Sequence, residues 1–355
     1  MSQGFLQNDA PFSLSVVVPN YNDGKYLRRC IDSVCSQDVP PDECIILDDA
    51  STDNSVQVIA EAIRGHPFAR IERNPKNLGQ GGVPNANKGL SLAKSKFVYF
   101  LGANDLILPG LFRKVRESLE ANPGAGLFSA MVWLIDEDDN YLRMHPSPVL
   151  SLSDTFITPQ QCREIMASKG SWLTGQTTVY RREALIAAGG FNATLGGLCD
   201  LLAAQVVAAR YGAAFSPSPL GVMRIHRGAF LVATVSEPKV LDAALDEVVR
   251  CGPLVEPKLF TADMLERTRL RFYFASLRLS LGATAAHIRT KVGGVRSAAL
   301  ALAQLVPASL PLIRTALYFL IMRPFDIHTT ILYRCLGAAA VRARERAAGR
   351  YPPKY

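Results

Sequence analysis

The sequence has 355 residues, of which 48% are hydrophobic, and it carries a formal net charge of +8. This length and apolar content allow one large folded domain or one domain with an appendage, and they exclude a wholly disordered chain. The chain has seven cysteines, and the absence of CxxC spacing argues against a disulfide framework or a zinc site and fits a reducing cytosol.

The positive charge is concentrated at the C-terminal end. Residues 285–355 contain eleven Lys or Arg and two acidic residues, so this segment alone has a surplus of nine positive charges. The remaining chain is close to neutral. Because the basicity belongs to the tail, the net charge gives no reason to expect a nucleic-acid partner.

Strands and helices alternate along the first part of the chain. Apolar and β-branched runs predict strands at residues 13–22, 43–51, 68–74, 97–101 and 125–136. Apolar residues at helical spacing predict helices at 25–37, 53–63 and 111–122 and the end of a helix at 87–96. Strands and helices joined by short links predict an α/β fold, with a mainly parallel sheet covered by helices on both faces.

Polar residues follow three of these strands. They are Asn20, Tyr21 and Asn22 after the first strand, Asp48 and Asp49 after the second, and Asn104 and Asp105 after the fourth. Ligands of such sheets bind beyond the carboxyl ends of the strands, so we expect these residues to converge on one site. The first turn has no GxGxxG and no P-loop, whereas carboxylates suit a divalent metal that bridges phosphate oxygens.

Four segments resemble the successive motifs of the family-two glycosyltransferases. They read SVVVPNYN, CIILDDASTDNS, NPKNLGQGG followed by NKGL, and FVYFLGANDLILPG. The resemblance covers roughly residues 12–230, and it is specific because several motifs occur in order at compatible spacing. It implies a GT-A-like fold, a nucleotide-sugar donor, most often UDP-linked, a divalent cation (Mg²⁺ or Mn²⁺) and inversion by direct displacement at the anomeric carbon.

The resemblance also implies roles for residues of the donor site. Pro19 and Tyr21 would line the base pocket, and Asp49 would bind the base, usually uracil. Lys76 lies in a segment that often supplies a basic donor contact, and Asn104 would offer an oxygen to the metal or the ribose.

Three further residues take roles from the same resemblance. Asp105 would bind the metal, His226, in MRIHRG, would approach the metal or the diphosphate, and Asp200 would be the catalytic base. The chain departs from the family at Gly102 and Asn104, where acids are common, and at Cys199, where Glu usually precedes the base. Because metal affinity falls with ligand charge, these departures predict weaker metal binding.

Each candidate also has a structural interpretation. Asp200 could cap the helix that runs to Tyr211, Asp105 could be a loop acid, and His226 could be structural. Trp172 could stack on an acceptor sugar or close the core. Turn and cap roles are favoured for Asp48 and Asp53, and a solvated hairpin turn is favoured for the acidic cluster 136–139.

The chain divides into a glycosyltransferase domain at 12–235 and a basic, helical C-terminal region at 236–355. Residues 297–313 are uncharged, but Pro307 and Pro311 interrupt them, so they do not predict a spanning helix. Basic, apolar and amphipathic segments together favour helices on an anionic membrane surface over a helical subdomain packed on the fold. The N-terminus shows no signal-peptide pattern, so we expect a cytoplasmic protein, peripheral at the inner face of the membrane.

These observations predict an inverting glycosyltransferase that moves a sugar to a hydroxyl of a glycan or lipid-linked acceptor. A nucleotidyltransferase would need a Gly-rich, basic loop after the first strand, and that loop is missing. A non-catalytic sugar-nucleotide binder in a polysaccharide assembly complex stays open. The changes at Gly102 and Asn104 favour it, while Asp49, Asp105 and Asp200 argue against it.

Overall fold

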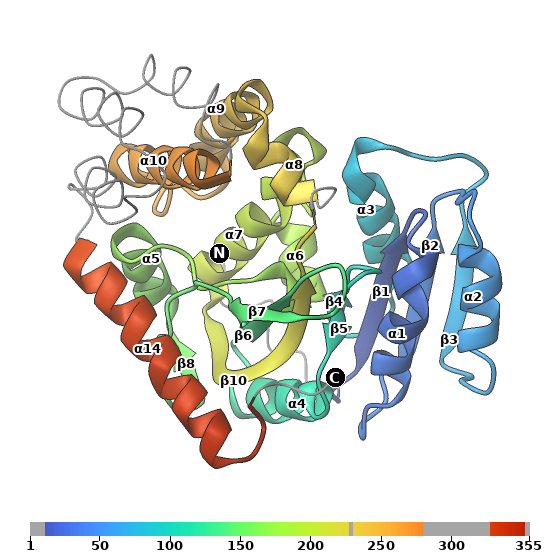
Figure 1. Cartoon of the computed structure of the whole chain (residues 1–355). Helices are drawn as coiled ribbons and strands as arrows, with labels where there is room; N and C mark the ends of the chain where they lie inside the picture. Colours follow the sequence, from blue (N-terminus) through green and yellow to red (C-terminus); the bar gives the residue numbers. More distant parts are fainter. Residues whose placement is uncertain (1–10, 227–229, 280–326, 352–355) are drawn as a thin grey trace.

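The computed structural model describes residues 11–226, 230–279 and 327–351 (Figure 1). A sheet runs through the centre in the order β3-β2-β1-β4-β9-β6-β10-β5, with β7 paired to β6 and β8 to β10. The strands are β1 Leu14–Asn20, β2 Glu43–Asp48, β3 Ala69–Arg73, β4 Phe97–Phe100, β5 Leu106–Ile107, β6 Leu127–Ile135, β7 Tyr141–Met144, β8 Thr155–Ile157, β9 Val179–Arg181 and β10 Ala213–Arg224.

Helices lie on both faces of this sheet, as the sequence predicts. The α-helices are α1 Gly24–Cys35, α2 Ser55–Ala62, α3 Val83–Leu92, α4 Leu111–Ala121, α5 Pro159–Ser168, α6 Arg182–Ala187, α7 Cys199–Tyr211, α8 Phe230–Ser236, α9 Pro238–Val255, α10 Ala262–Leu279 and α14 Ile327–Ala347. Three short 3₁₀ helices are η1 Gln80–Gly82, η2 Gly175–Thr177 and η3 Ala193–Leu198.

The first part of the sheet confirms the predicted parallel arrangement. β1 pairs in parallel with β2 and with β4, and β2 pairs in parallel with β3. The register sets Asn20 opposite Asp48 at the carboxyl ends of β1 and β2. The turns that carry the predicted donor residues therefore leave the sheet at one edge.

The second part of the sheet is mixed, which the sequence does not predict. β9 lies antiparallel between β4 and β6, and the long strand β10 pairs in parallel with β6 and antiparallel with β5 and β8. β5, β8 and β9 have two or three residues each. Such short strands offer too few residues for an alternating pattern to stand out.

Alternation along β1 divides the core into two layers. Val16 and Val18 are fully buried on the side covered by α1, α2 and α4, whereas Val17 is fully buried on the side covered by α3 and α5–α7. Successive side chains of a strand point to opposite faces, so one apolar run serves both layers.

The described part of the C-terminal region is helical and packs on the sheet domain. α9 and α10 lie in the region that the sequence predicts to be helical, and Figure 1 shows them grouped with α8. Both α8 and α9 pack against η3. In α14, Val341 is fully buried and Arg344 donates a hydrogen bond to the carbonyl oxygen of Leu152 at 3.1 Å. Residues 297–313, which bear on the membrane prediction, lie outside the described residues.

One stretch of the described residues is long and apolar enough to cross a membrane. It is Ala193–Tyr211, which comprises η3 and α7, and 61% of it is buried inside the protein. Length and composition alone are weak evidence here, because the core helix of a globular domain passes the same test.

Candidate active site

The turns after β1 and β2 are tied to each other by buried side chains. The Asn20 side-chain amide donates to Asp48 at 3.0 Å and to the Ser51 hydroxyl at 3.1 Å. Asp53 accepts from the backbone N–H groups of Gly24 and Ser55. Asp48 and Asp53 thus hold turns and helix starts in place, as their favoured structural interpretation expects.

Tyr21 follows this network directly. Its side chain is 48% exposed, whereas Pro19, at the end of β1, is half-buried. An aromatic ring presented to solvent at the carboxyl edge of a sheet can cover the face of a base. Their role in a base pocket stays a prediction, which this position at the carboxyl edge of the sheet allows.

Asp49 connects the turn after β2 to the loop after β3. Its carboxylate is 3% exposed and accepts from the Asn74 side-chain amide at 2.6 Å. The Leu78 backbone N–H donates to its two oxygens, at 3.0 and 3.1 Å. Lys76 lies exposed in this loop, and Lys88, which sequence reasoning missed, donates to Asn74 at 2.7 Å.

The side-chain oxygens of Asn104 and Asp105 converge beside Gly102. A side-chain carbon at Gly102 would lie 3.2 Å from Asp105 Oδ2 and 3.5 Å from Asn104 Oδ1, so both oxygens face the space that glycine leaves open. Asp105 Oδ1 accepts from the Arg224 backbone N–H at 2.8 Å. Burial raises the pKa of Asp105 to about 7, and the contacts with Arg224 oppose this shift.

This donor set fits a small divalent cation that draws its other ligands from water and substrate. Mg²⁺ is commonly held by one or two protein oxygens together with phosphate oxygens. Within residues 11–226, 230–279 and 327–351, no three His, Cys, Asp or Glu side chains form a metal cluster. The fit therefore rests on one carboxylate and one amide oxygen, consistent with the weak binding that the sequence predicts.

His226 lies against Asn104 at this edge. The side-chain nitrogen of Asn104 and Nε2 of His226 are 2.8 Å apart. An amide nitrogen only donates, so Nε2 of His226 is the acceptor when the Asn104 side chain is assigned in this way. The lone pair of Nε2 is then occupied by this hydrogen bond. This arrangement suits a contact with the diphosphate better than direct coordination of a metal.

Arg224 is a site residue that sequence reasoning missed. Its side chain is 1% exposed and donates to the carbonyl oxygens of Asn104 and Asp136, at 3.1 and 2.7 Å, and to Asp139 at 2.6 Å. The guanidinium also lies over the ring of Tyr26, at 4.3 Å from its centroid. The acidic turn between β6 and β7 therefore contacts the site as well as solvent. The sequence signal for Arg224 was the Arg-x-His spacing in MRIHRG.

Asp23 is an acidic residue near this site that sequence reasoning also missed. Burial raises its pKa; nearby His226 and Arg224 lower it and Asp53 raises it. These influences place Asp23 close to the same edge. It follows Asn22 in a turn, where an acid is common and gives no signal of its own.

Asp200 is the second residue of α7. Its Oδ1 accepts from the Leu201 backbone N–H at 2.7 Å, and burial raises the pKa of its carboxyl group. Its Oδ2 faces Gly175, the first residue of η2. The next residue of η2, Gln176, donates from its side chain to the carbonyl oxygen of Leu106 at 2.6 Å. η2 therefore contacts both Asp200 and the segment that carries Asp105.

Trp172 has no exposed surface in the structure. It belongs to the core layer that contains α7, and its indole nitrogen has no hydrogen-bond partner among the described residues. This position fits the core-closing alternative for Trp172.

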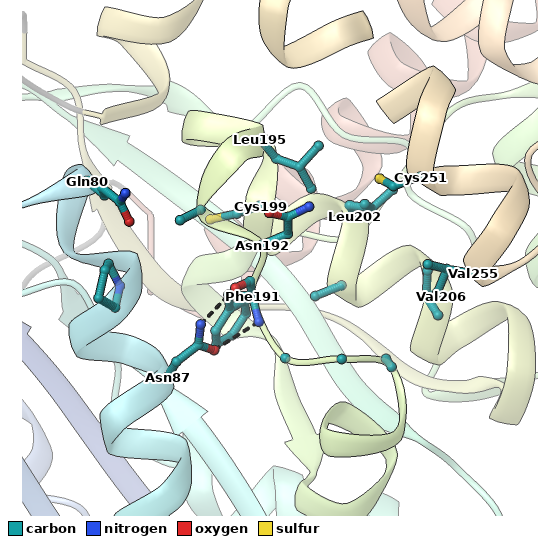
Figure 2. A pocket seen from close by; sticks show the side chains of 16 residues that line it. Gln80, Asn87, Phe191, Asn192, Leu195, Cys199, Leu202, Val206, Cys251 and Val255 are labelled. Atoms are coloured by element: carbon teal, nitrogen blue, oxygen red, sulfur yellow. Dashed lines mark hydrogen bonds between the residues drawn. The ribbon is translucent and has the colours of Figure 1, made fainter. Parts of the chain in front are cut away.

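A pocket of about 520 Å³ opens on the other side of α7 (Figure 2). It lies between α3, the turn at Gly189–Asn192, η3, α7 and α9, and Cys199, the neighbour of Asp200, forms part of its wall. Asn87 fixes one side through two hydrogen bonds to the backbone of Phe191, at 2.8 and 3.0 Å. The lining contains no charged side chain, so this pocket does not suit a diphosphate.

The fold resembles solved glycosyltransferase structures. Staphylococcus aureus TarS 1–349 in complex with UDP-GlcNAc superimposes with a TM-score of 0.59 at 18% identity, over 96% of this chain and 93% of that one. The mannosyltransferase PcManGT of Pyrobaculum calidifontis, in complex with GDP-Man and Mn²⁺, gives 0.55 at 19% identity, over 94% and 87%. At these identities the likeness shows the fold, which is the GT-A-like α/β architecture that the sequence predicts.

Sequence comparisons place the chain more closely. An uncharacterized glycosyltransferase of Nostoc sp. is 31% identical over 174 residues, which are 48% of this chain and 52% of that protein, so the match spans about half the length of this relative. Residues 15–187 match the family described as Glycosyl transferase family 2. The motifs, the fold and these relatives agree that residues 15–187 of this chain belong to glycosyl transferase family 2.

Proposed function

We propose that this protein transfers a sugar from a nucleoside diphosphate sugar, with uridine as the nucleoside, to a hydroxyl of a glycan or lipid-linked acceptor. The proposed reaction inverts the anomeric centre. The observation that carries the proposal is that η2 meets the Asp200 side chain at Gly175 and the backbone of Leu106, next to Asp105, through Gln176. One carboxylate can then serve as a base while the other lies with the leaving group.

The donor would bind along the carboxyl edge of β1, β2 and β4. The exposed ring of Tyr21, beside Pro19, would cover the base, and Asp49 would accept from the imide N–H of uracil through lone pairs left free by Leu78 and Asn74. The exposed Lys76 would approach the phosphates. The UDP-GlcNAc bound to TarS supports uridine, and the GDP-Man bound to PcManGT makes guanosine the alternative to test.

The diphosphate would lie over the turn after β4. Asp105 Oδ2 and Asn104 Oδ1 would hold a Mg²⁺ or Mn²⁺ ion, which, when bound, supplies Lewis-acid neutralisation of the diphosphate. His226 would add a diphosphate contact beside Asn104. Arg224 fixes the turn by binding the carbonyl oxygen of Asn104.

Asp200 would be the general base. Its carboxylate takes the proton from the acceptor hydroxyl while that oxygen bonds to the anomeric carbon and the bond to the diphosphate breaks. Help of this kind contributes about 10²–10⁴-fold to the rate. One base without a protein nucleophile predicts a single displacement, and therefore inversion.

The test is turnover of a panel of UDP-, GDP- and CDP-sugars by the full chain, with and without Mn²⁺, followed by proton NMR of the released sugar. We expect turnover of a UDP-sugar, stimulated by the cation, with a first-formed product of the opposite anomeric configuration. Retention of configuration would overturn the single-displacement mechanism. Binding of UDP without turnover of any donor or acceptor would favour the non-catalytic sugar-nucleotide binder.

We also propose that the protein works at the cytoplasmic face of a membrane. The surplus of nine positive charges in residues 285–355 supports this, because each Lys or Arg near an anionic surface contributes about 1 kcal/mol. Full-length protein should sediment with phosphatidylserine vesicles at low salt and dissociate at high salt. No sedimentation at low salt would assign the basic tail to the fold or to a protein partner.

A further inference from the structure

The side chain of Asp200 covers one face of Gly175. A side-chain carbon built at Gly175 would overlap Asp200 Oδ2, and its next neighbours would be Cγ of Asp200 at 3.3 Å and Cβ at 3.8 Å. All three nearest atoms belong to Asp200. The space that a side chain at position 175 would need is therefore taken by the carboxylate alone.

The backbone of Gly175 does not itself require glycine. Its φ lies outside the left-handed region, and η2 is a 3₁₀ turn that other residues can adopt. The reason for a glycine here is thus the missing side chain and the room it leaves.

The turn beneath Asp200 is held firmly. The carbonyl oxygen of Gln176 accepts from the buried Tyr99 hydroxyl at 2.6 Å. The Gln176 side chain donates to the Leu106 carbonyl oxygen, also at 2.6 Å. The Thr177 hydroxyl donates to the carbonyl oxygen of Ala130 at 2.7 Å. A clash at Gly175 would therefore be relieved by rotation of the Asp200 side chain, because the turn cannot easily yield.

We infer that Gly175 is a positioning residue for the catalytic base. By lacking a side chain it lets the Asp200 carboxylate rest on η2, at a fixed place relative to the turn that carries Asp105. This inference rests on the proposed function, since it gives Gly175 a role only if Asp200 acts as the base.

The surroundings of Asp200 allow its position to be followed through the pH dependence of the rate. Among the described residues, the titratable groups that face it are Tyr180 on β9, whose hydroxyl lies 3.5 Å from the Asp200 carbonyl oxygen, and Cys199 on α7. Burial raises the pKa of Tyr180 well above its usual value and that of Cys199 to about 12, so both stay protonated near neutral pH. Burial raises the pKa of Asp105 to about 7, so Asp105 also contributes to the acid limb, but position 175 meets only Asp200. A difference in the acid limb between Gly175→Ala and the parent protein would therefore report on Asp200.

The experiment compares Gly175→Ala with Gly124→Ala, a control at an exposed turn where an added carbon meets nothing within 4 Å. We expect Gly175→Ala to lower kcat roughly 10²-fold, the scale of a 1 Å misplacement, with UDP affinity and donor KM unchanged. Burial raises the pKa of Asp200, and a carboxylate displaced toward solvent should lose part of that shift, so the acid limb of kcat/KM should move to lower pH. Gly124→Ala should match the parent protein.

Unchanged kcat and an unchanged pH profile in Gly175→Ala would overturn the inference. The proposed function fails separately, if Asp200→Asn keeps full transfer. If Gly175→Ala does not fold, the double variant Gly175→Ala with Asp200→Ala tests the contact instead, because removing the carboxylate removes the clash. If the double variant has the same Tm as the Asp200→Ala single variant, the contact is supported. A double variant that still does not fold would overturn it.

Discussion

The donor half of the molecule and the half that carries Asp200 are held together differently. Around β1 and β2, Asp48 and Asp49 are almost fully buried, and each accepts hydrogen bonds from neighbouring turns. Asp200 accepts one such bond, from the next residue of its own helix, and rests against the face of Gly175. Hydrogen bonds therefore fix Asp48 and Asp49, whereas contact with Gly175 places the Asp200 side chain.

This difference predicts that the two halves are sensitive to different kinds of substitution. In the donor half, loss of a polar partner should matter most, because it leaves buried donors or acceptors unpaired. In the half with Asp200, changes of volume beside that side chain should matter most, because its carboxylate rests by contact on Gly175, in a turn that hydrogen bonds hold in place. Arg224 belongs to both halves, since it comes from β10 and binds the backbone of Asn104.

The largest expected effect is on stability and comes from the packed half. Trp172→Ala should lower the free energy of unfolding by about 4 kcal/mol, because Trp172 is fully buried. Trp172→Phe should cost about 1.5 kcal/mol or less, since it removes an indole N–H that has no partner among the described residues. Urea unfolding measures both. A stable Trp172→Ala variant with a raised acceptor KM would instead support the acceptor-stacking role.

The next effect tests the residue that joins the two halves. Arg224→Met should cost about 3 kcal/mol, because it leaves the carbonyl oxygens of Asn104 and Asp136 without their buried charged donor. The matched control is Arg113→Ala, whose exposed ion pair with Asp38 should be worth about 0.5 kcal/mol. Thermal unfolding compares the two, and equal losses would deny Arg224 its joining role.

The smallest effect concerns base recognition in the hydrogen-bonded half. Asp49→Ala should weaken UDP binding about tenfold, or ~1.4 kcal/mol, and reduce the preference for UDP over CDP. Asn74→Ala breaks one hydrogen bond of the same carboxylate but keeps the carboxylate itself. It should lower stability and retain the UDP preference. Calorimetric titration with both nucleotides separates the roles, and an unchanged preference in Asp49→Ala would remove Asp49 from base recognition.

The donor half was largely predictable from sequence because its contacts are local in pattern. A β-branched run followed by a polar turn identifies both the strand and the edge at which Asn20 and Asp48 meet. The resemblance added donor-binding roles for their neighbours Pro19, Tyr21 and Asp49. The pattern could not show that Asp49 also holds the loop at Leu78, because that contact joins two turns across 29 residues.

The other half was less predictable because distant packing decides it. Gln176 reaches Leu106 across 70 residues, and Arg224 reaches Asn104 across 120. No periodicity marks a three-residue 3₁₀ turn such as η2, and β9, which follows it in the chain, is equally short. Sequence reasoning could nominate Asp200 by resemblance, but the glycine beneath it became visible only when the two segments were placed together.

Transfer by Asp200→Asn, measured alongside its UDP affinity, tests the account most directly. The amide keeps the size of the side chain but cannot take a proton from the acceptor. We predict unchanged UDP binding and a loss of transfer of about 10²–10⁴-fold, or ~3–5 kcal/mol in the barrier. Near-normal transfer, or a collapse of UDP binding with residual transfer intact, would contradict the assignment of Asp200 as the base.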